Sequence, residues 1–416
     1  MIAWLLISFF VLLFLGVPIA MSLGLSAIGG ILFLGGGSTV TIAQRMFEGM
    51  NSFALLAIPL YTFAGFTMSK GGISKRLMDF CYSIVGHIYG GLAHVNVLSS
   101  MIFAGISGSA VADTAGVSGM FMPEMVRKGY SKNFTVAVTA ISSTIGIIIP
   151  PSIPMVVIAG ICGISTGKLF LGGIIPGILC GLAQMIVSYF LAKKEGVPKE
   201  PGHFTIGPVL HGLWESWPAL LMPIIIVGTI TMGIVSPTEA GVIAVVYGLF
   251  AGGIIYRELK WEDIKFAFAE TVRTSGRIFI VIGAAKLYTV MLTTAGFDKW
   301  VAKTMLGFST NPTVILIMIL LIFFIVTMFM ESIATLTLFM PILYPIALGV
   351  GIDPIVLSVL ITVVIGVGLV TPPVGMCIYV ACDLMDVTVG EVFPTLVPFI
   401  AATFVCIALM VAFPQL

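Results

Sequence analysis

Residues 143–151 read Ser-Thr-Ile-Gly-Ile-Ile-Ile-Pro-Pro, and residues 365–373 read Ile-Gly-Val-Gly-Leu-Val-Thr-Pro-Pro. Each stretch lies inside a longer apolar segment, 133–163 in the first case and 355–383 in the second. A proline inside a helix removes a backbone hydrogen bond and clashes with the preceding turn. Two prolines in a row after a glycine therefore predict a broken helix in each segment. A simple kink is the alternative, but it explains two equivalent breaks at mid-segment less well.

The two prolyl pairs are related by a constant offset in residue number, which takes Pro150 to Pro372. The same offset relates a further set of residues and segments: Gly146 with Gly368, Pro123 with Pro345, Ser109 with Glu331, Asp113 with Thr335, and 92–126 with 313–347. Chance similarity between apolar segments is the alternative explanation. Several matches at one offset favour an internal repeat.

The composition excludes a soluble protein. The 416 residues are 59% hydrophobic and only 9% charged, with a mean hydropathy of +1.18, whereas a soluble domain carries roughly 25% charged residues. Disordered chains are poor in apolar residues, so disorder is excluded too. A net charge of +1 without a polybasic run argues against nucleic acid as a partner. Six cysteines without a CxxC motif are expected to be reduced packing residues.

A membrane-spanning helix needs about 20 apolar residues. The candidate apolar segments are 2–35 (broken near Pro18), 51–68, 92–126, 133–163, 169–192, 217–235, 239–256, 276–295, 313–347, 355–383 and 392–414. Four basic loops separate some of them: Lys70/Lys75/Arg76, Arg127/Lys128/Lys132, Lys193/Lys194/Lys199 and Arg257/Lys260/Lys265. Basic loops favour the cytoplasmic side of a membrane, so we expect all four on that side.

The segment 92–126 separates the first two basic loops and cannot be a single crossing if both loops are cytoplasmic. It is also too long for one span, and its middle, residues 105–109, reads Gly-Ile-Ser-Gly-Ser. We therefore predict a re-entrant helical hairpin, preceded by an interfacial helix over 76–91. Counting crossings, 51–68 runs inward and 276–295 outward, so the second hairpin, 313–347, opens to the opposite side. Such inverted-topology repeats are typical of secondary transporters.

The residues that can bind a ligand gather at the hairpin tips and the helix breaks. They are Ser107, Gly108 and Ser109 at the first tip, Ser142, Ser143, Thr144 and Gly146 at the first break, and Gly366, Gly368 and Thr371 at the second. Carbonyl and hydroxyl oxygens suit Na⁺, and the N–H ends of half-helices suit a carboxylate. The alternative is a small-residue surface for close helix packing.

Two ionisable residues, Asp113 and Glu331, lie inside the predicted hairpins. An ionisable group at membrane depth is costly, so each is a candidate functional residue. The alternative is a helix N-cap or a pair with a neighbouring base. Glu239, after Ser236-Pro237-Thr238, instead fits the first turn of a capped helix. Lys286 is expected to snorkel or to pair with a partner chain.

Two other functions fit the sequence less well. Residues 105–108, Gly-Ile-Ser-Gly, match the motif of intramembrane serine proteases, but a nucleophilic serine needs a base. The four histidines, His87, His94, His203 and His211, do not lie in a later span, so we do not expect an enzyme. A passive channel of the water-channel type usually has six spans, fewer than this chain offers.

Several sequence motifs occur in the order found in one transporter family. They are Leu56-Ala57-Ile58-Pro59-Leu60, Gly86-His87 with Gly90-Gly91-Leu92-Ala93, residues 103–110, 143–154 and 371–375. In these motifs the chain resembles the large membrane subunit of tripartite ATP-independent periplasmic (TRAP) transporters. The resemblance implies a bacterial inner-membrane importer of organic acids, such as C4-dicarboxylates or sialic acids, driven by a Na⁺ gradient without an organic cofactor. Proton coupling remains an alternative.

The same resemblance implies two partners and an elevator mechanism. A periplasmic binding protein would deliver the substrate, and a small four-helix membrane subunit would be a separate chain. The implied Na⁺ ligands are Ser107, Ser109, Ser143, Thr144 and Gly146, with Thr335, Gly366, Gly368 and Thr371 in the second repeat. The substrate would lie between the tips, near Ser107, Ser109, Asp113, Glu331 and Thr335. Many members carry Asp where this chain has Glu331, which adds a methylene and could alter substrate choice.

The predicted organisation is all-helical with inverted repeats. Scaffold spans occupy 1–69, an interfacial arm 70–91, and the first repeat of the transport domain 92–192. A loop and further scaffold spans occupy 193–275, a span and a second arm 276–312, and the second transport repeat 313–416.

Overall fold

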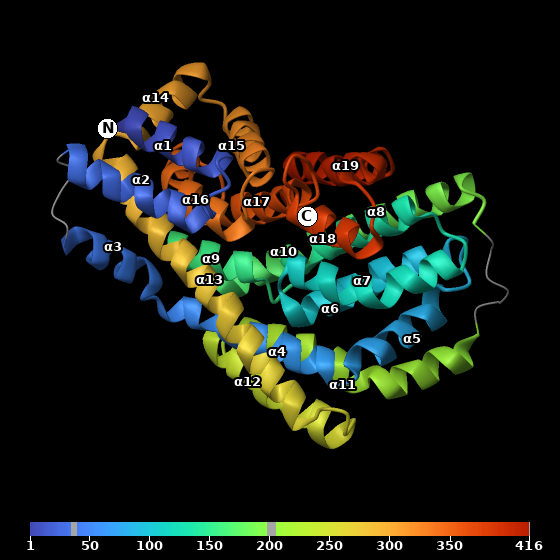
Figure 1. Cartoon of the computed structure of the whole chain (residues 1–416). Coiled ribbons are helices and arrows are strands. Elements are labelled where there is room, and N and C mark those ends of the chain that lie inside the picture. Colours follow the sequence, from blue (N-terminus) through green and yellow to red (C-terminus); the bar gives the residue numbers. More distant parts are fainter. Residues whose placement is uncertain (35–39, 198–204, 416) are drawn as a thin grey trace.

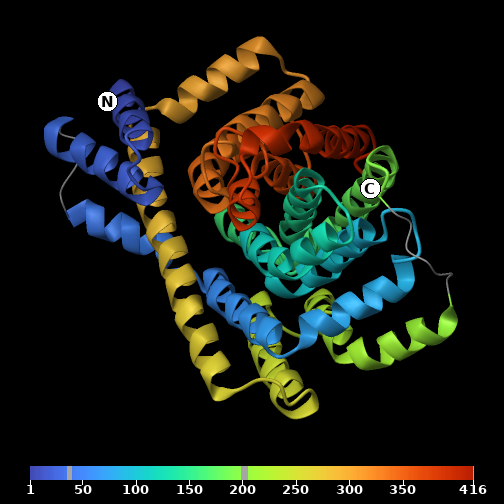
Figure 2. The same ribbon diagram turned by 45° about the vertical axis from the view of Figure 1, so that its right-hand side comes forward.

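The computed structural model describes residues 1–34, 40–197 and 205–415, and within these ranges it contains helices and no strand. Residues Lys199 and His203, which entered the predictions above, lie outside the described ranges. The helices form two groups (Figures 1 and 2). Residues 91–194 and 312–412 form a compact inner bundle, and residues 2–85 and 206–308 form a frame along its sides.

The frame contains long spans and short arms. Its helices are α1 (Ile2–Phe14), α2 (Ile19–Leu34), α3 (Val40–Met50), η1 (Phe53–Leu56), α4 (Ala57–Lys70), α5 (Ile73–Val85), α11 (Ile206–Thr231), α12 (Pro237–Phe250), the π-helix η3 (Ala251–Ile255), α13 (Trp261–Thr294) and α14 (Phe297–Phe308). Helix α13 packs against α2, α3 and α4, so it ties the two parts of the frame together. The chain breaks between α1 and α2 at Gly16, close to the expected Pro18.

The inner bundle consists of two sets of five helices in the same order. The first set is α6 (Gly91–Ser107), α7 (Ala110–Arg127), α8 (Lys132–Ser143) with the 3₁₀ turn η2 (Thr144–Ile147), α9 (Ile153–Cys162) and α10 (Thr166–Lys194). The second set is α15 (Pro312–Thr327), α16 (Ser332–Gly349), α17 (Pro354–Gly368), α18 (Met376–Met385) and α19 (Val389–Ala412). The offset that takes Pro150 to Pro372 also takes the bounds of α7 to those of α16, Ser332 and Gly349. The predicted repeat is therefore present in the helices themselves.

Both predicted helix breaks are observed. The helix ends at Ser143 before the first prolyl pair and resumes at Ile153, and it ends at Gly368 before the second pair and resumes at Met376. The peptide bonds Pro150–Pro151 and Pro372–Pro373 are both cis. After each pair, a backbone N–H donates to a carbonyl of the adjacent hairpin tip, Ile153 to Gly108 at 3.2 Å and Val374 to Met328 at 3.0 Å. Each broken helix is thus joined to the hairpin of its own repeat.

The two repeats meet at equivalent residues. A methyl group placed on Gly366 would lie 3.3 Å from Cβ of Thr144, and positions 144 and 366 are related by the repeat offset. Equivalent residues can touch only where the pseudo-two-fold axis passes between them. The packing around this point is reciprocal, because α8 contacts α19 while α17 contacts α10.

The four basic loops meet in pairs. Arg76 donates to Glu258 at 2.6 Å and lies over the ring of Tyr256, which joins the first loop to the fourth. Ser131 donates to Glu195 at 2.9 Å, which joins the second loop to the third. These contacts agree with the prediction that the members of each pair share one side. The hairpins are observed as α6–α7 and α15–α16, and their re-entrance into the bilayer stays a prediction.

Two helices of the frame, α12 and α13, can be compared with the segments predicted from the sequence. Helix α13 begins at Trp261, well before the expected segment 276–295, so the polar residues before this segment and the segment itself form one continuous helix. At 1.5 Å per residue, its 34 residues extend about 51 Å, longer than the ~30 Å hydrocarbon core. Hydropathy reports only the apolar part of such a helix. The expected cap at Glu239 is confirmed, because Ser236 and Glu239 form a capping box.

The contact across the repeat axis predicts a cross-link. A disulfide needs Cβ atoms about 3.5–4.5 Å apart, close to the 3.3 Å between Thr144 and a methyl on Gly366. The double variant Thr144→Cys/Gly366→Cys should form a disulfide on mild oxidation, detected by mass spectrometry of the unreduced digest. Thr144→Cys/Gly349→Cys is the control, because a side chain at Gly349 meets no atom within 4 Å. Equal cross-linking in both pairs would contradict the predicted axis.

Candidate functional site

The first hairpin tip brings four predicted site residues together. Helix α6 ends at Ser107, Gly108 turns the chain with φ 65°, and Ser109 caps α7 by accepting from the Ala112 N–H. The Ser107 hydroxyl donates to Oδ1 of Asp113 in the first turn of α7, and the Ser109 N–H donates to the Ser107 hydroxyl at 3.3 Å. Serine at the cap position and glycine at the turn are the residues that such a helix start requires. The tip is therefore built from local sequence.

Asp113 has one carboxyl oxygen without a partner among the described residues. The side chain is fully buried, and its Oδ2 accepts no hydrogen bond there. This oxygen is directed at the first helix break, because any side chain on Gly146 would collide with it. A buried carboxylate oxygen without a hydrogen bond is costly unless a cation or proton occupies its free side. Asp113 of the hairpin and Gly146 of the broken helix are thus brought face to face.

The hydroxyls at both breaks, and that of Thr335 in the second hairpin, donate to helix carbonyls. The donor–acceptor pairs are Ser143 to Thr139 at 2.7 Å, Thr144 to Ile141 at 2.7 Å, Thr335 to Glu331 at 3.1 Å, and Thr371 to Val367 at 2.7 Å. A hydroxyl that donates its proton to a carbonyl keeps its oxygen lone pairs for another partner. These residues can therefore still act as oxygen ligands for a hard cation.

Glu331 occupies the position equivalent to Ser109 and caps α16. Its Oε2 accepts from the N–H groups of Ile333 and Ala334 at 3.0 and 3.3 Å, and Ser332 donates to Oε1 at 2.7 Å. The N-cap alternative considered from the sequence is thus what the structure shows. The two intramembrane carboxyls differ in kind: that of Glu331 is held by its own helix, whereas Asp113 keeps an oxygen free.

Helix α18 of the second repeat lies beside both hairpins. Val374, just before α18, donates to the Met328 carbonyl at the second hairpin tip, and α18 packs against α7 of the first hairpin. Both hairpins are therefore adjacent to α18, although they belong to different repeats.

The first tip also touches the frame. A methyl group on Gly65 of α4 would lie 3.3 Å from Cα of Ser107, and one on Gly105 would lie 2.6 Å from Pro223 of α11. A side chain at Gly105 would collide with Pro223, and one at Gly65 would be tightly packed against the backbone of Ser107. The tip packs against the frame through small, uncharged groups.

A buried polar network beneath the first break was not found from the sequence. Asn96 donates to Thr139 at 2.7 Å and accepts from Ser142 at 3.0 Å, and Ser100 donates to Ser142 at 3.1 Å. Their equivalents in the second repeat are apolar: Met318, Ile322, Ile361 and Val364. Asn96, a polar residue inside the apolar segment 92–126, is the feature of the sequence from which this network could have been predicted.

The serine protease interpretation fails on geometry. His94 lies on the same helix as Ser107 but nearly four turns earlier, about 20 Å along the axis. Its Nε2 is bonded to the Tyr89 carbonyl at 3.1 Å. Among the described residues, Ser107 has Asp113 and the Ser109 N–H as its hydrogen-bond partners, and neither is a base placed as in a protease triad.

Repeated helical units with hairpins and broken helices are typical of membrane transporters. Seven helices are long and apolar enough to cross a membrane within the described residues. A family model described as "Tripartite ATP-independent periplasmic transporter, DctM component" matches residues 6–416. The chain belongs to this family. It is a component of a transporter and not an enzyme, and it is a multi-pass protein of the inner membrane, as predicted.

Relatives that are named for different substrates match along almost the whole chain. The isethionate TRAP transporter permease protein DctMQ of Oleidesulfovibrio alaskensis is 37% identical over 94% of this chain, which spans 62% of that protein. The sialic acid large permease protein SiaM of Vibrio cholerae is 35% identical, over 97% of this chain and 94% of its own. The C4-dicarboxylate large permease protein DctM of Pseudomonas aeruginosa is also 35% identical, over 94% and 92%.

The fold has a distant counterpart among solved structures. The YdaH transporter of Alcanivorax borkumensis superposes with a TM-score of 0.60 over 89% of this chain and 86% of its own, at 14% identity. At that identity the likeness concerns the fold alone. It confirms the expected all-helical transporter architecture.

The cap geometry predicts different effects for two substitutions of Glu331. Glu331→Ala removes the acceptor for two backbone N–H groups and should destabilise the protein by about 1 kcal/mol. Glu331→Gln keeps an acceptor oxygen, so its melting temperature should stay close to that of the unaltered protein. Asp353→Ala, which removes the cap of α17 away from the site, is the control for cap loss. If the glutamine variant melts as early as the alanine variant, the negative charge and not the cap carries the role of Glu331.

Proposed function

We propose that the protein imports an organic acid driven by a Na⁺ gradient, with the ion and the substrate bound between the two hairpin tips. The observation that carries this proposal is the unpartnered Oδ2 of the buried Asp113, directed at Gly146. A cation there would neutralise a charge that is otherwise isolated in a medium of low polarity. Na⁺ prefers oxygen ligands, and the neighbouring groups are hydroxyls and backbone carbonyls.

The first repeat supplies the better cation site. Asp113 offers a carboxylate oxygen, and Ser107, Ser109, Ser143 and Thr144 would supply neutral oxygens. The second repeat offers Thr335, Thr371 and the backbone at Gly366 and Gly368, but its carboxylate is engaged in the cap of α16. A second Na⁺ there would be held by neutral oxygens and would bind more weakly. We therefore propose that the first site is loaded first.

The substrate would lie between the two hairpin tips, at the N-termini of α7 and α16. Each terminus points backbone N–H groups and the positive end of the helix dipole toward the tip, which favours an anion. The charge of Asp113 repels a carboxylate until Na⁺ neutralises it. Binding of the ion is thus a condition for binding of the acid, which is the differential affinity that coupled transport requires.

The substrate class follows from the relatives only in part. The relatives are named for isethionate, sialic acid and C4-dicarboxylates, which are all organic acids with at least one acidic group. We propose the same broad class for this chain. The tip contacts through Gly65 and Gly105 are compatible with an inner bundle that slides against the frame, which is the proposed elevator motion.

We propose the partners that the family description implies. A small membrane subunit would cover part of the exposed apolar surface of the frame, and a periplasmic binding protein would deliver the acid. The alternative in which Asp113 takes a proton and not Na⁺ uses the same oxygen, so the cation must be identified by experiment.

Thermal stability identifies the cation. A ligand bound only to the folded state raises stability by about 2.7 kcal/mol at a concentration 100 times its Kd. The purified chain should melt at a higher temperature in NaCl than in choline chloride of equal ionic strength. The rise should disappear in Asp113→Asn, which removes the charge, and in Gly146→Ala, whose methyl group would displace the carboxylate. Ser358→Ala, a buried serine in α17 that donates to Pro354, should keep it.

A rise that persists in Asp113→Asn would place the cation elsewhere and contradict the site. No rise at any NaCl concentration would shift the proposal to proton coupling.

Uptake into vesicles tests the coupling directly. With an inward Na⁺ gradient, N-acetylneuraminate, succinate or isethionate should accumulate above equilibrium, together with the binding protein for the acid. A gradient of protons without Na⁺ should not drive uptake. Passive equilibration with neither gradient would indicate a channel. Asp113→Asn should abolish accumulation, whereas Ser358→Ala should not change it.

A further inference from the structure

Lys286 is the isolated charge of the long frame helix α13. Between Arg277 and Asp298 it is the one residue among Asp, Glu, Lys, Arg and His. It lies just over two turns before the end of α13 at Thr294, about 12 Å along the axis, and therefore within the apolar part of the helix. A charge at that depth is costly and marks a functional site unless a structural partner explains it.

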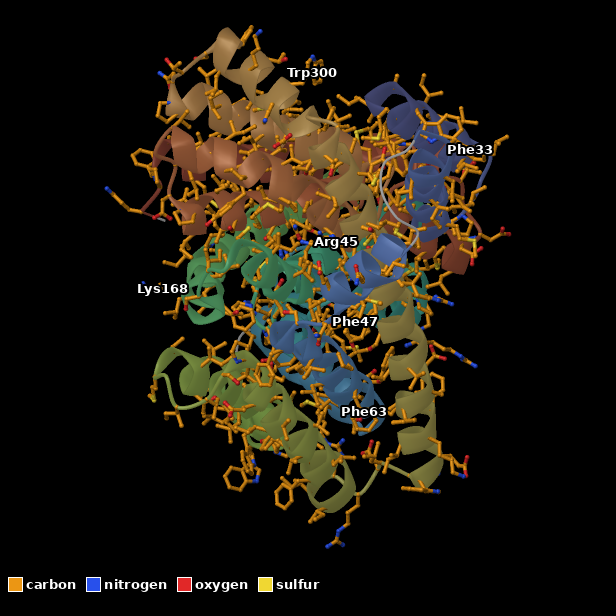
Figure 3. All side chains as sticks on the ribbon, turned by 90° about the vertical axis from the view of Figure 1, so that its left-hand side faces the viewer. Phe33, Arg45, Phe47, Phe63, Lys168 and Trp300 are labelled. Atoms are coloured by element: carbon orange, nitrogen blue, oxygen red, sulfur yellow. The ribbon has the colours of Figure 1, made fainter. Side chains whose placement is uncertain are left out.

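No structural partner explains Lys286 within the described part of the chain. It makes no hydrogen bond or ion pair there. Glu48, on the neighbouring helix α3, is paired instead with Arg45 of its own helix at 2.8 Å. Figure 3 shows Arg45 on α3, where this helix runs beside α13.

The stem of Lys286 is held by the crossing of α3 and α13. A methyl group on Gly49 would lie 2.6 Å from Cβ of Lys286, and one on Gly283 would lie 3.2 Å from the Met46 carbonyl. Neither helix has room for an additional side chain at this crossing. The lysine is fixed at its base, and its charged end is free.

The side chain borders a cavity of about 200 Å³ between the frame and the inner bundle. The walls include Glu48, Ser52 and Lys286 of the frame and Gly160, Thr337 and Pro341 of the inner bundle. Pockets for drug-sized ligands measure roughly 300–1,000 Å³, so this smaller cavity has room for part of such a molecule, such as its acidic end. It is bounded by the two groups of helices that the proposed motion would displace.

The cavity lies beside the second hairpin. Thr337 follows Glu331 by less than two turns of α16, about 9 Å from the hairpin tip along the axis. In the orientation predicted from the basic loops, 276–295 runs outward and the second hairpin opens outward. The cavity then lies on the outer side of the site, between the membrane surface and the hairpin tips.

We propose that Lys286 and this cavity form a transient anion subsite that receives the acidic group of the substrate on its way to the hairpin tips. The inference rests on the proposed import of an organic acid and adds a residue of the frame to it. A fixed positive charge in a medium of low polarity attracts an anion strongly. It also keeps the acid from having to enter the apolar interface without a counter-charge. The ligand class is an organic anion with a carboxylate or sulfonate group.

Two other roles for Lys286 and the cavity predict different results. If Lys286 serves to neutralise Glu48 in another arrangement of the same helices, removing either charge should have the same effect, and removing both should restore function. If a lipid phosphate occupies the cavity, its effect should depend on the lipid and not on a small anion.

The electrostatic potential in the cavity is measured with two thiol reagents of opposite charge. In the full chain carrying Cys162→Ser and Ser52→Cys, reconstituted in phosphatidylcholine vesicles, an anionic methanethiosulfonate should react faster than a cationic one. Cys162 is removed because it is the half-buried native cysteine, the other five being buried. Adding Lys286→Met should lower the ratio of anionic to cationic rates about tenfold. Adding Glu48→Gln instead should leave the ratio unchanged or raise it.

An unchanged ratio in Lys286→Met would overturn the anion subsite. Equal loss in Lys286→Met and Glu48→Gln, with recovery in the double variant, would replace it by a local ion pair. A ratio that falls when phosphatidylglycerol replaces phosphatidylcholine, but does not fall in Lys286→Met, would assign the cavity to a lipid phosphate and also overturn the anion subsite.

Transport kinetics test whether the subsite lies on the substrate path. Using whichever of N-acetylneuraminate, succinate and isethionate the unaltered chain transports, Lys286→Met should raise the KM about tenfold with little change in the maximal rate. Lys286→Arg keeps the charge and should stay near the unaltered KM. An unaltered KM in Lys286→Met would remove the subsite from the path. If the unaltered chain accumulates none of these acids on a Na⁺ gradient, the proposed function fails, while the reagent ratio still decides the anion subsite.

Discussion

In the hydrocarbon core of a membrane, water cannot satisfy a backbone N–H or C=O group, so every break in a helix needs another partner for the groups it frees. This chain breaks two helices at mid-bundle and supplies part of the partnership from the neighbouring hairpins. Ile153 donates to Gly108 in one repeat and Val374 to Met328 in the other. Each hairpin is therefore a requirement of the break beside it. The polar groups that remain at these places are available to a ligand.

The two repeats have the same backbone fold but different side chains at equivalent positions. The position that is Ser109 in one is Glu331 in the other, and both cap the second helix of a hairpin. Serine caps with a neutral oxygen and leaves the charge to Asp113, whose second oxygen is free. Glu331 caps α16 with its own carboxylate, which is engaged by the N–H groups of that helix. The Asn96–Ser142 network supports the first break alone. A symmetric fold thus holds different polar groups in its two halves, and this difference is the basis of the proposal that the first half favours a cation more than the second.

The frame and the inner bundle meet through contrasting contacts. Near the first hairpin tip the surfaces are glycine against backbone or proline, as at Gly65 and Gly105. Farther along α16 they enclose a cavity bordered by a lysine. The ion pair between Arg76 and Glu258 lies within the frame and not at this boundary. The contacts at Gly65 and Gly105 involve no charged group, which is compatible with displacement of the inner bundle along the frame.

The sequence by itself determined the helical class, the repeat offset, both helix breaks and the residues at the first tip. These depend on local causes: proline geometry, the length of apolar runs, and serine and glycine at a helix start. The length of α13 was not predicted, because hydropathy ends where charges such as Arg273 begin although the helix does not. Glu331 as a cap was left open, because glutamate is not among the usual N-cap residues. Only the tertiary structure decided that Asp113 faces Gly146, that Thr144 touches Gly366, and that Lys286 borders a cavity. Each of these depends on helices far apart in the chain, whose relative placement is set by packing and is not encoded in any single segment.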